Sequence, residues 1–282
     1  MTTRSQMTRR FFLGSSVATA TLAGPLGRLV AGQEDKNPYG HFKMGIQSYS
    51  LRHYNTDEAL VKTKDLGLRY WESFSQHLPL TDSAEKIAEY KKKLAANGVT
   101  LMAYGVQGFG KDTDANRKQF EFAKAMGFRV ISADPTPDSF DNLDKLVEEY
   151  KINIAIHNHG PRSRYSKIDD VLKAIRDHHE RIGACVDTGH YLRSDVNPVD
   201  AIGAFSLRTY GVHLKDVKNL PGGEKKFTIL GEGDLDIVGC LKALKKLNFE
   251  HCMSLEYEEN KENPIADIRQ CLSAVREAVM KV

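Results

Sequence analysis

The segment Ile154-Ala155-Ile156-His157 is a short apolar run that ends in a side chain able to bind a metal ion, and three later segments repeat this arrangement. They are Ala184-Cys185-Val186-Asp187, Tyr210-Gly211-Val212-His213 and Met253-Ser254-Leu255-Glu256. Short apolar runs of this kind are typical of buried strands in parallel sheets. We therefore expect four strands that each carry a histidine or a carboxylate at the carboxyl end.

The rest of the chain extends this pattern into a regular alternation. Strands are expected over 43–49, 70–74, 100–106, 129–133, 152–157, 183–187, 210–214 and 251–256, and helices over 57–66, 83–97, 114–126, 139–150, 167–180, 198–207, 235–248 and 264–280. Eight strand–helix units favour a single-domain α/β fold, the (β/α)8 barrel. An open doubly wound sheet is the alternative, but the glycine-rich phosphate loop of dinucleotide folds does not follow the first strand.

Composition narrows the function classes. The chain has 282 residues, of which 41% are hydrophobic, and 40 Lys and Arg stand against 37 Asp and Glu. Without a strong basic excess, nucleic acid is not the expected partner. The four cysteines have neither CxxC nor zinc-ribbon spacing, so we expect them to be buried apolar residues without disulfides. They are Cys185, Cys240, Cys252 and Cys271.

The N-terminus differs in kind from the rest. Thr8-Arg9-Arg10-Phe11-Phe12-Leu13-Gly14 is a twin-arginine pattern, and the apolar run after it is too short and broken to span a bilayer. We expect a signal peptide over 1–31, a linker over 32–41 and the barrel over 42–282. The twin-arginine translocase would then be a partner during export, and the protein would be periplasmic or otherwise exported. The alternative is an ordinary basic N-terminus.

The carboxyl ends of barrel strands converge on one mouth, where active sites lie. His157, Asp187, His213 and Glu256 would meet there, and a divalent metal ion would offset the cost of burying them together. One strand-end His or Asp alone would more often be a cap, but four on adjacent strands favour a metal site. Nitrogen and oxygen ligands suit manganese, cobalt, zinc or iron better than calcium, and magnesium is also compatible.

Five short motifs then carry a resemblance to a known family. They are Gly45-Ile46-Gln47-Ser48-Tyr49-Ser50-Leu51-Arg52, Val186-Asp187-Thr188-Gly189-His190, Val212-His213-Leu214-Lys215-Asp216, Leu230-Gly231-Glu232-Gly233 and Ser254-Leu255-Glu256-Tyr257-Glu258. As a set they resemble the sugar phosphate isomerase/epimerase branch of the xylose isomerase-like TIM barrels, from about residue 42 to the C-terminus. The resemblance implies a metal held by Glu, Asp, His and Glu, and Asp187, His213 and Glu256 match three of these positions.

The fourth position departs from that family pattern. The family has Glu at the end of strand five, where this chain has His157-Asn158-His159. In the epimerases this Glu is both a ligand and one of two opposed bases. His157 can replace it as a ligand, so two-base epimerisation is in doubt, and a histidine base or a lyase reaction becomes more attractive.

Five further residues are candidates for the site. Glu72, at the end of strand two, could bind a substrate hydroxyl or act as an acid–base group, or could form a salt bridge. His159 is a candidate acid–base group. His190 matches a family residue that contacts substrate oxygens, but it could be a loop cap. Lys215 could stabilise an enolate or be a solvated loop residue, and His77 could contact substrate from its loop.

Together these features predict a divalent-metal-dependent isomerase or epimerase that acts on a free sugar or keto-sugar through an enediolate. Glu256 would move the proton, with His159, Glu72 or His157 as the second group. One alternative is a lyase or dehydratase acting on a 3-keto-glycoside or inosose-like substrate. Another is a non-catalytic carbohydrate-binding barrel. In each case the partner is a small carbohydrate, and the oligomeric state is open.

Overall fold

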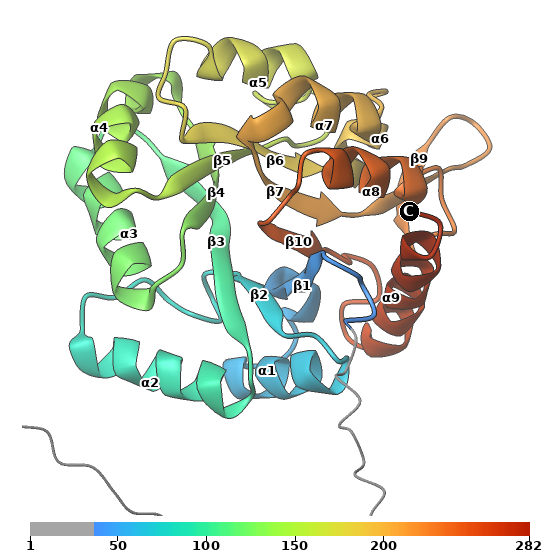
Figure 1. The fold of residues 1–282 in the computed structure, drawn as a ribbon, viewed down its shortest axis with the longest axis horizontal. Helices are drawn as coiled ribbons and strands as arrows, with labels where there is room; N and C mark the ends of the chain where they lie inside the picture. Colours follow the sequence, from blue (N-terminus) through green and yellow to red (C-terminus); the bar gives the residue numbers. More distant parts are fainter. Residues whose placement is uncertain (1–36) are drawn as a thin grey trace, which may run out of the picture. The chain divides into compact units, whose positions relative to one another are not determined.

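Eight parallel strands close into a ring in the order β1-β10-β7-β6-β5-β4-β3-β2 in the computed structural model, which describes residues 37–282 (Figure 1). The strands are β1 (Lys43–Gln47), β2 (Tyr70–Ser73), β3 (Thr100–Phe109), β4 (Val130–Pro135), β5 (Asn153–His157), β6 (Ile182–Asp187), β7 (Thr209–Leu214) and β10 (Cys252–Leu255). The predicted (β/α)8 barrel is confirmed.

Helices surround this ring on the outside, as Figure 1 shows. They are α1 (Thr56–Asp65), α2 (Ala84–Ala96), α3 (Thr113–Met126), α4 (Phe140–Tyr150), α5 (Ile168–Ile175), α6 (Thr188–Arg193), α7 (Pro198–Phe205), α8 (Ile237–Lys246) and α9 (Ile265–Val279). N-capping residues mark the start of two of these helices. The Ser83 hydroxyl caps α2, and Asn197 caps α7 ahead of Pro198.

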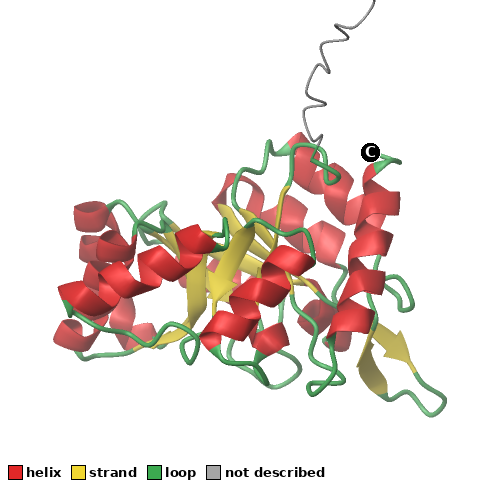
Figure 2. Ribbon diagram, turned by 90° about the horizontal axis from the view of Figure 1, so that it is seen from below, coloured by secondary structure: helices red, strands yellow, loops and turns green. Residues whose placement is uncertain are grey.

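Two elements near the site were not expected from the sequence. The six-residue helix α6 follows β6 directly, and an antiparallel hairpin of β8 (Asp216–Asn219) and β9 (Lys225–Thr228) follows β7. The hairpin projects from the barrel in Figure 2. Both elements are too short for a clear periodic signal, yet each brings a residue to the site.

The main apolar core lies between the strands and the helices. Trp71, Leu60, Phe120 and Leu143 are fully buried there. All four cysteines are free and buried, which confirms the prediction from their spacing.

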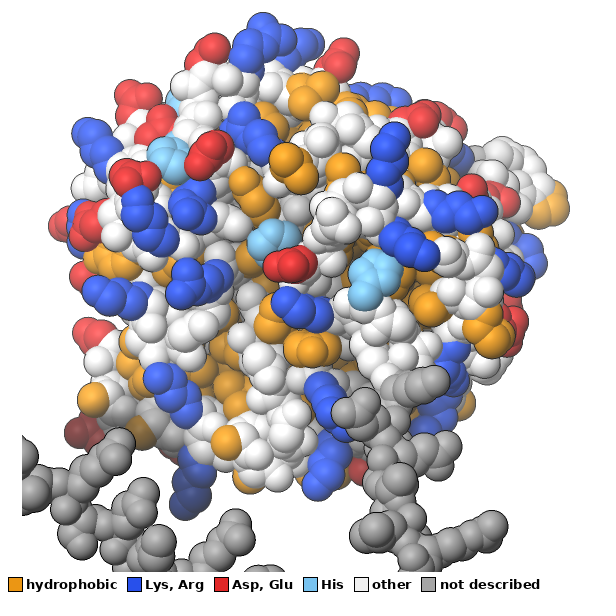
Figure 3. Space-filling view, viewed as in Figure 1, with side chains coloured by type: hydrophobic (Ala, Val, Ile, Leu, Met, Phe, Trp, Pro, Cys, Tyr) orange, Lys and Arg blue, Asp and Glu red, His pale blue; other side chains and the backbone are white. Residues whose placement is uncertain are grey.

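The compact unit of the barrel begins at Asn37. The predicted signal peptide and residues 32–36 of the predicted linker lie outside the described residues. Residues 37–41 of that linker instead belong to the barrel unit, because Tyr39 is buried and its hydroxyl accepts a hydrogen bond from Arg276. Within residues 37–282, no helix is both long and apolar enough to cross a membrane. Figure 3 shows Lys and Arg interspersed with Asp and Glu over one face.

Candidate active site

Four potential metal ligands meet where β5, β6, β7 and β10 end. His157, Asp187, His213 and Glu256 are all buried, and their ligand atoms lie within 4.8 Å of one another. His157 Nε2 is 3.0 Å from His213 Nδ1 and 3.4 Å from Asp187 Oδ2. His213 Nδ1 is 3.1 Å from Glu256 Oε2. The strand ends therefore converge as the sequence analysis expected.

The donor set fits a divalent ion. Four ligands arranged tetrahedrally at zinc-like bond lengths would be about 3.3 Å apart, close to the three separations above. Asp187 Oδ2 is buried and, within residues 37–282, accepts no hydrogen bond of good geometry. Lys215 Nζ lies 3.1 Å from this oxygen but without hydrogen-bond geometry, so the oxygen keeps lone pairs that a divalent ion could accept.

Lys215 is the cation nearest to this set. It is buried, and its Nζ lies 3.1 Å from Asp187 Oδ2 and 2.8 Å from Glu256 Oε2, with a further ion pair to Glu258. Burial alone would lower the pKa of Lys215, but the three carboxylates outweigh it and hold that pKa well above its usual value. Lys215 is thus a permanent, compensated positive charge.

The motif after β6 builds this corner of the site residue by residue. Asp187 Oδ1 accepts a hydrogen bond from the His190 backbone N–H and so caps α6. The Thr188 hydroxyl donates to the Lys215 carbonyl, which ties the ends of β6 and β7 together. Gly189 leaves room for the Lys215 stem, because a Cβ there would lie 2.7 Å from Lys215 Cγ.

Glu72 lies beneath the four ligands rather than in the cavity above them. Its Oε2 is 2.9 Å from His213 Nε2, and its carboxylate also accepts hydrogen bonds from the Ser132 and Ser254 hydroxyls. Burial would raise the pKa of Glu72, but His213 and the hydroxyls outweigh burial and lower it. This geometry does not support the acid–base role suggested for Glu72. Its position, 2.9 Å from His213 Nε2 as an ion pair, fits a carboxylate that supports a metal-binding histidine.

His77 is not brought to the site. Its Nδ1 lies 2.8 Å from the Ser48 hydroxyl, its Nε2 lies 3.0 Å from the Tyr54 carbonyl oxygen, and its ring stacks on Trp71. Burial lowers its pKa. Both ring nitrogens are occupied inside the protein, so the geometry does not support the substrate contact suggested for His77.

A cavity of about 390 Å³ opens above the ligand set. It is lined by Gln47, Tyr49, Phe74, Gly105, Val106, His157, His159, His190, Arg193, Lys215, Phe227, Glu256 and Glu258. His159 and His190 thus lie where the sequence analysis placed them. Burial lowers the pKa of His159 to about 4 and that of His190 to about 3, so both are neutral near pH 7.

Several lining residues were missed by sequence reasoning. Glu258 follows Glu256 by two positions, and the strand-like alternation of β10 could have placed both on one side. Arg193 is the last residue of α6, and Phe227 belongs to the hairpin. Neither of these two short elements had a signal in the sequence that could have indicated its place.

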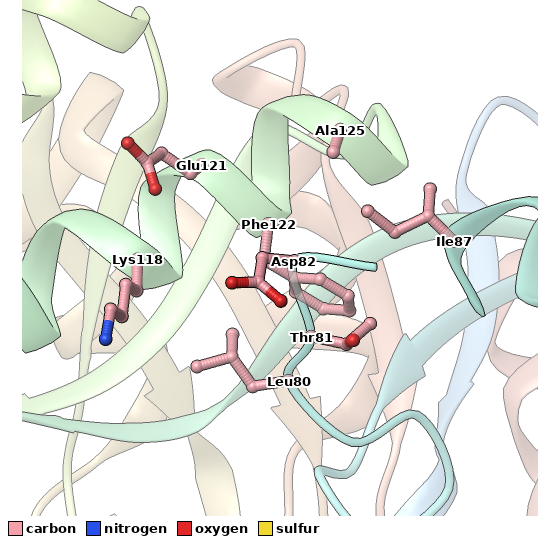
Figure 4. Close-up of a pocket in the computed structure, with 8 residues that line it drawn as sticks. All are labelled: Leu80, Thr81, Asp82, Ile87, Lys118, Glu121, Phe122 and Ala125. Carbon is pink, nitrogen blue, oxygen red and sulfur yellow. The ribbon is translucent and has the colours of Figure 1, made fainter. Parts of the chain in front are cut away.

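A second cavity of about 380 Å³ lies outside the barrel, against α2, α3 and the loop before α2 (Figure 4). It is lined by Leu80, Thr81, Asp82, Ile87, Lys118, Glu121, Phe122 and Ala125. The cluster of potential metal ligands lies at the strand ends and contributes no residue to this second cavity.

Comparison with known proteins agrees with this architecture. The profile of the xylose isomerase-like TIM barrel family matches residues 60–277. The chain belongs to this family. An inosose dehydratase from Clostridium botulinum (strain Eklund 17B / Type B) is 26% identical over 215 residues, which cover 71% of each chain.

Two solved structures share the fold. L-Ribulose 3-epimerase superposes with a TM-score of 0.68 at 15% identity, over 85% of this chain and 95% of the other. The IOLI protein, solved with a bound zinc atom, gives a TM-score of 0.67 at 18% identity, over 85% of this chain and 99% of the other. Relatives of this chain are thus enzymes of sugar-like substrates, and one protein of the same fold binds zinc.

Proposed function

We propose that the protein is a divalent-metal-dependent isomerase or epimerase that moves a proton at a carbon next to the carbonyl of a free sugar or keto-sugar. The observation that carries this proposal is the meeting of His157, Asp187, His213 and Glu256, of which His157 and Glu256 line a cavity at the strand ends. The cavity volume suits a monosaccharide-sized ligand. The names of the relatives agree with a small sugar-like substrate.

The chain's own residues would bind the metal ion and transfer the proton. A divalent ion bound by the four ligands would supply Lewis acidity, which makes a C–H bond beside a carbonyl more acidic. Glu256 lines the cavity, and its contacts with His213 and Lys215 are both made by Oε2. Its Oε1 is therefore the atom that accepts the substrate proton. His159 lines the same cavity as a neutral imidazole and is the second acid–base group.

A dehydratase reaction is the second candidate. It shares the first proton transfer but ends with loss of a β-hydroxyl instead of reprotonation at carbon. The likeness to an inosose dehydratase favours it, as does the histidine at position 157, where the epimerases carry a second carboxylate base. An inosose-like ring or a 3-keto-glycoside would be its substrate.

Proton exchange tests both candidates at once. Manganese-loaded protein would be incubated in deuterated water with keto-sugars, 3-keto-glycosides and inososes, and the products followed by NMR. Deuterium incorporation at a carbon next to the carbonyl supports the proposal, and the product then separates isomer from dehydrated compound. A binding-only barrel would incorporate no deuterium into any of these compounds.

We also propose export through the twin-arginine translocase, on the basis of Arg9 and Arg10. Replacing both with lysine should leave the precursor in the cytoplasm, as measured by cell fractionation. Unchanged export of that variant would contradict the assignment.

A further inference from the structure

One charged residue of the cavity lining, Arg193, has no ion pair among residues 37–282. Apart from the histidines, the charged lining residues are Arg193, Lys215, Glu256 and Glu258. Both glutamates are ion-paired with Lys215, which also pairs with Asp187 below them. Among residues 37–282, no carboxylate lies within ion-pair distance of Arg193, and its side-chain hydrogen bond is a long one, 3.4 Å from Nη1 to His190 Nδ1.

Arg193 is nevertheless held in a defined position. Its guanidinium carbon lies 5.0 Å from the centre of the Phe227 ring, in cation–π geometry. On another side it packs against Gly160, where an added Cβ would lie 3.1 Å from Nη1. The hairpin and the loop after β5 therefore hold a guanidinium without an ion pair at the cavity wall.

Other arginines near the strand ends are satisfied by the protein. Arg52 donates to the Tyr49 and Glu258 carbonyl oxygens. Arg164 is 3.0 Å from Asp134 and does not line the cavity. Arg193 differs from Arg52 because its guanidinium donates to no backbone carbonyl oxygen within residues 37–282, and it differs from Arg164 because it has no carboxylate partner there. Its planar donors match a carboxylate or phosphate group.

We propose that Arg193 binds an anionic substituent of the substrate, so that the site takes a sugar acid or another anionic sugar in preference to the neutral sugar. This rests on the proposed function, since it names the substrate class of the same cavity. A carboxylate and a phosphate would present the same chemistry to a guanidinium, and the experiment must separate them.

The test uses the full chain loaded with manganese and matched pairs of ligands. Isothermal titration would compare D-glucose with D-glucuronate, D-galactose with D-galacturonate, and D-glucose with D-glucose 6-phosphate. Loss of a charge-assisted contact should weaken binding roughly 10-fold or more. We therefore expect the anionic member to bind at least about 10-fold more tightly. The pair with the larger ratio identifies the anion.

Three variants assign that preference to Arg193. Arg193→Gln should abolish it without changing the affinity for the neutral sugar, and Arg193→Lys should restore part of it because the charge remains without the planar fork. The matched control Arg164→Gln should keep the full preference. If Arg193→Gln does not fold, Arg193→Lys and the weakening of anion binding by salt still decide the matter.

Two results would overturn the inference. Equal affinity for both members of every pair contradicts it while leaving the proposed function intact. A preference that survives in Arg193→Gln would assign the anion to the metal instead. If the wild-type protein binds none of these sugars and exchanges no substrate proton, the proposed function fails and this inference fails with it.

Discussion

The two halves of one barrel end very differently. Strands β5, β6, β7 and β10, which are neighbours in the ring, carry His157, Asp187, His213 and Glu256 at their carboxyl ends. Strands β1 to β4 end at Gln47, Ser73, Phe109 and Pro135. The two carboxylates near these ends do not line the cavity, because Glu72 contacts His213 below it and Asp134 pairs with Arg164 outside it. Strands of both halves belong to one closed parallel barrel, so the difference that matters for metal binding lies in the side chains at the strand ends.

This contrast shows that the potential metal ligands lie on one side of the barrel mouth. The charged half can hold the metal ion, while Gln47, Tyr49 and Phe74 give the neutral half a wall that suits the hydroxyls and C–H faces of a sugar. Glu72 crosses between the halves: it starts on β2 and reaches His213 on β7 below the cavity. Three predictions follow the contrast, from the largest expected effect to the smallest.

Replacing the Glu256 carboxylate of the charged half by an amide should remove most of the catalytic activity. Glu256→Gln keeps the shape of the side chain and an oxygen donor but cannot accept a proton. We expect activity, measured as deuterium exchange and product formation, to fall by about 10²-fold or more, with partial retention of metal. Glu259→Gln, outside the cavity, is the matched control and should be as active as wild type. If Glu256→Gln with bound metal exchanges substrate deuterium as fast as wild type, another residue transfers the proton. His159 is then the next candidate.

Glu72, which connects the two halves, should affect metal affinity more than catalysis. Glu72→Gln removes the charge that faces His213 Nε2 but keeps the hydrogen-bonding partners Ser132 and Ser254. Metal should bind roughly 10- to 100-fold more weakly, as for other carboxylates that orient metal-binding histidines. Competition with a chromogenic chelator measures this. If the affinity is unchanged while turnover falls at saturating metal, Glu72 acts in the chemistry after all.

A substitution at His77, in the neutral half, should change the stability of the protein rather than its turnover. His77→Gln removes hydrogen bonds to Ser48 and Tyr54, so the free energy of unfolding should fall by about 1–3 kcal/mol, with turnover at saturating substrate unchanged. Denaturant titration measures the free energy of unfolding. A raised KM with unchanged stability would return His77 to the substrate site.

The same variant has a pH signature. Burial holds the folded-state pKa of His77 below its usual value of 6.5, so the unfolded chain binds more protons below that pH. The contribution of His77 to stability is therefore present above about pH 6.5 and lost as the pH falls. Stability of His77→Gln should fall less steeply than that of wild type between about pH 7 and 5. Identical slopes would show that the ring does not resist protonation.

Some of this site could be predicted from the sequence because barrel geometry does the positioning. The carboxyl ends of barrel strands converge at the mouth, and His157, Asp187, His213 and Glu256 were found on that basis. The depth of Glu72 could not be predicted, since alternation along β2 gives the direction of a side chain but not its height in the barrel.

Other residues depended on structure that leaves no periodic signal. Arg193 and Phe227 come from a six-residue helix and a short hairpin, and His77 turns inward because Ser48 and Tyr54 offer it partners from distant positions. Such contacts are set by tertiary packing, so they became visible only in the folded chain.

The metal content of the purified protein tests the central claim most directly. Elemental analysis should find about one equivalent of divalent metal per chain, bound by the four strand-end ligands. The double variant Asp187→Asn/His213→Ala, folded as judged by circular dichroism, should contain none, while the control Asp144→Asn, far from the site on α4, should contain as much as wild type. One full equivalent retained by the double variant would contradict the account.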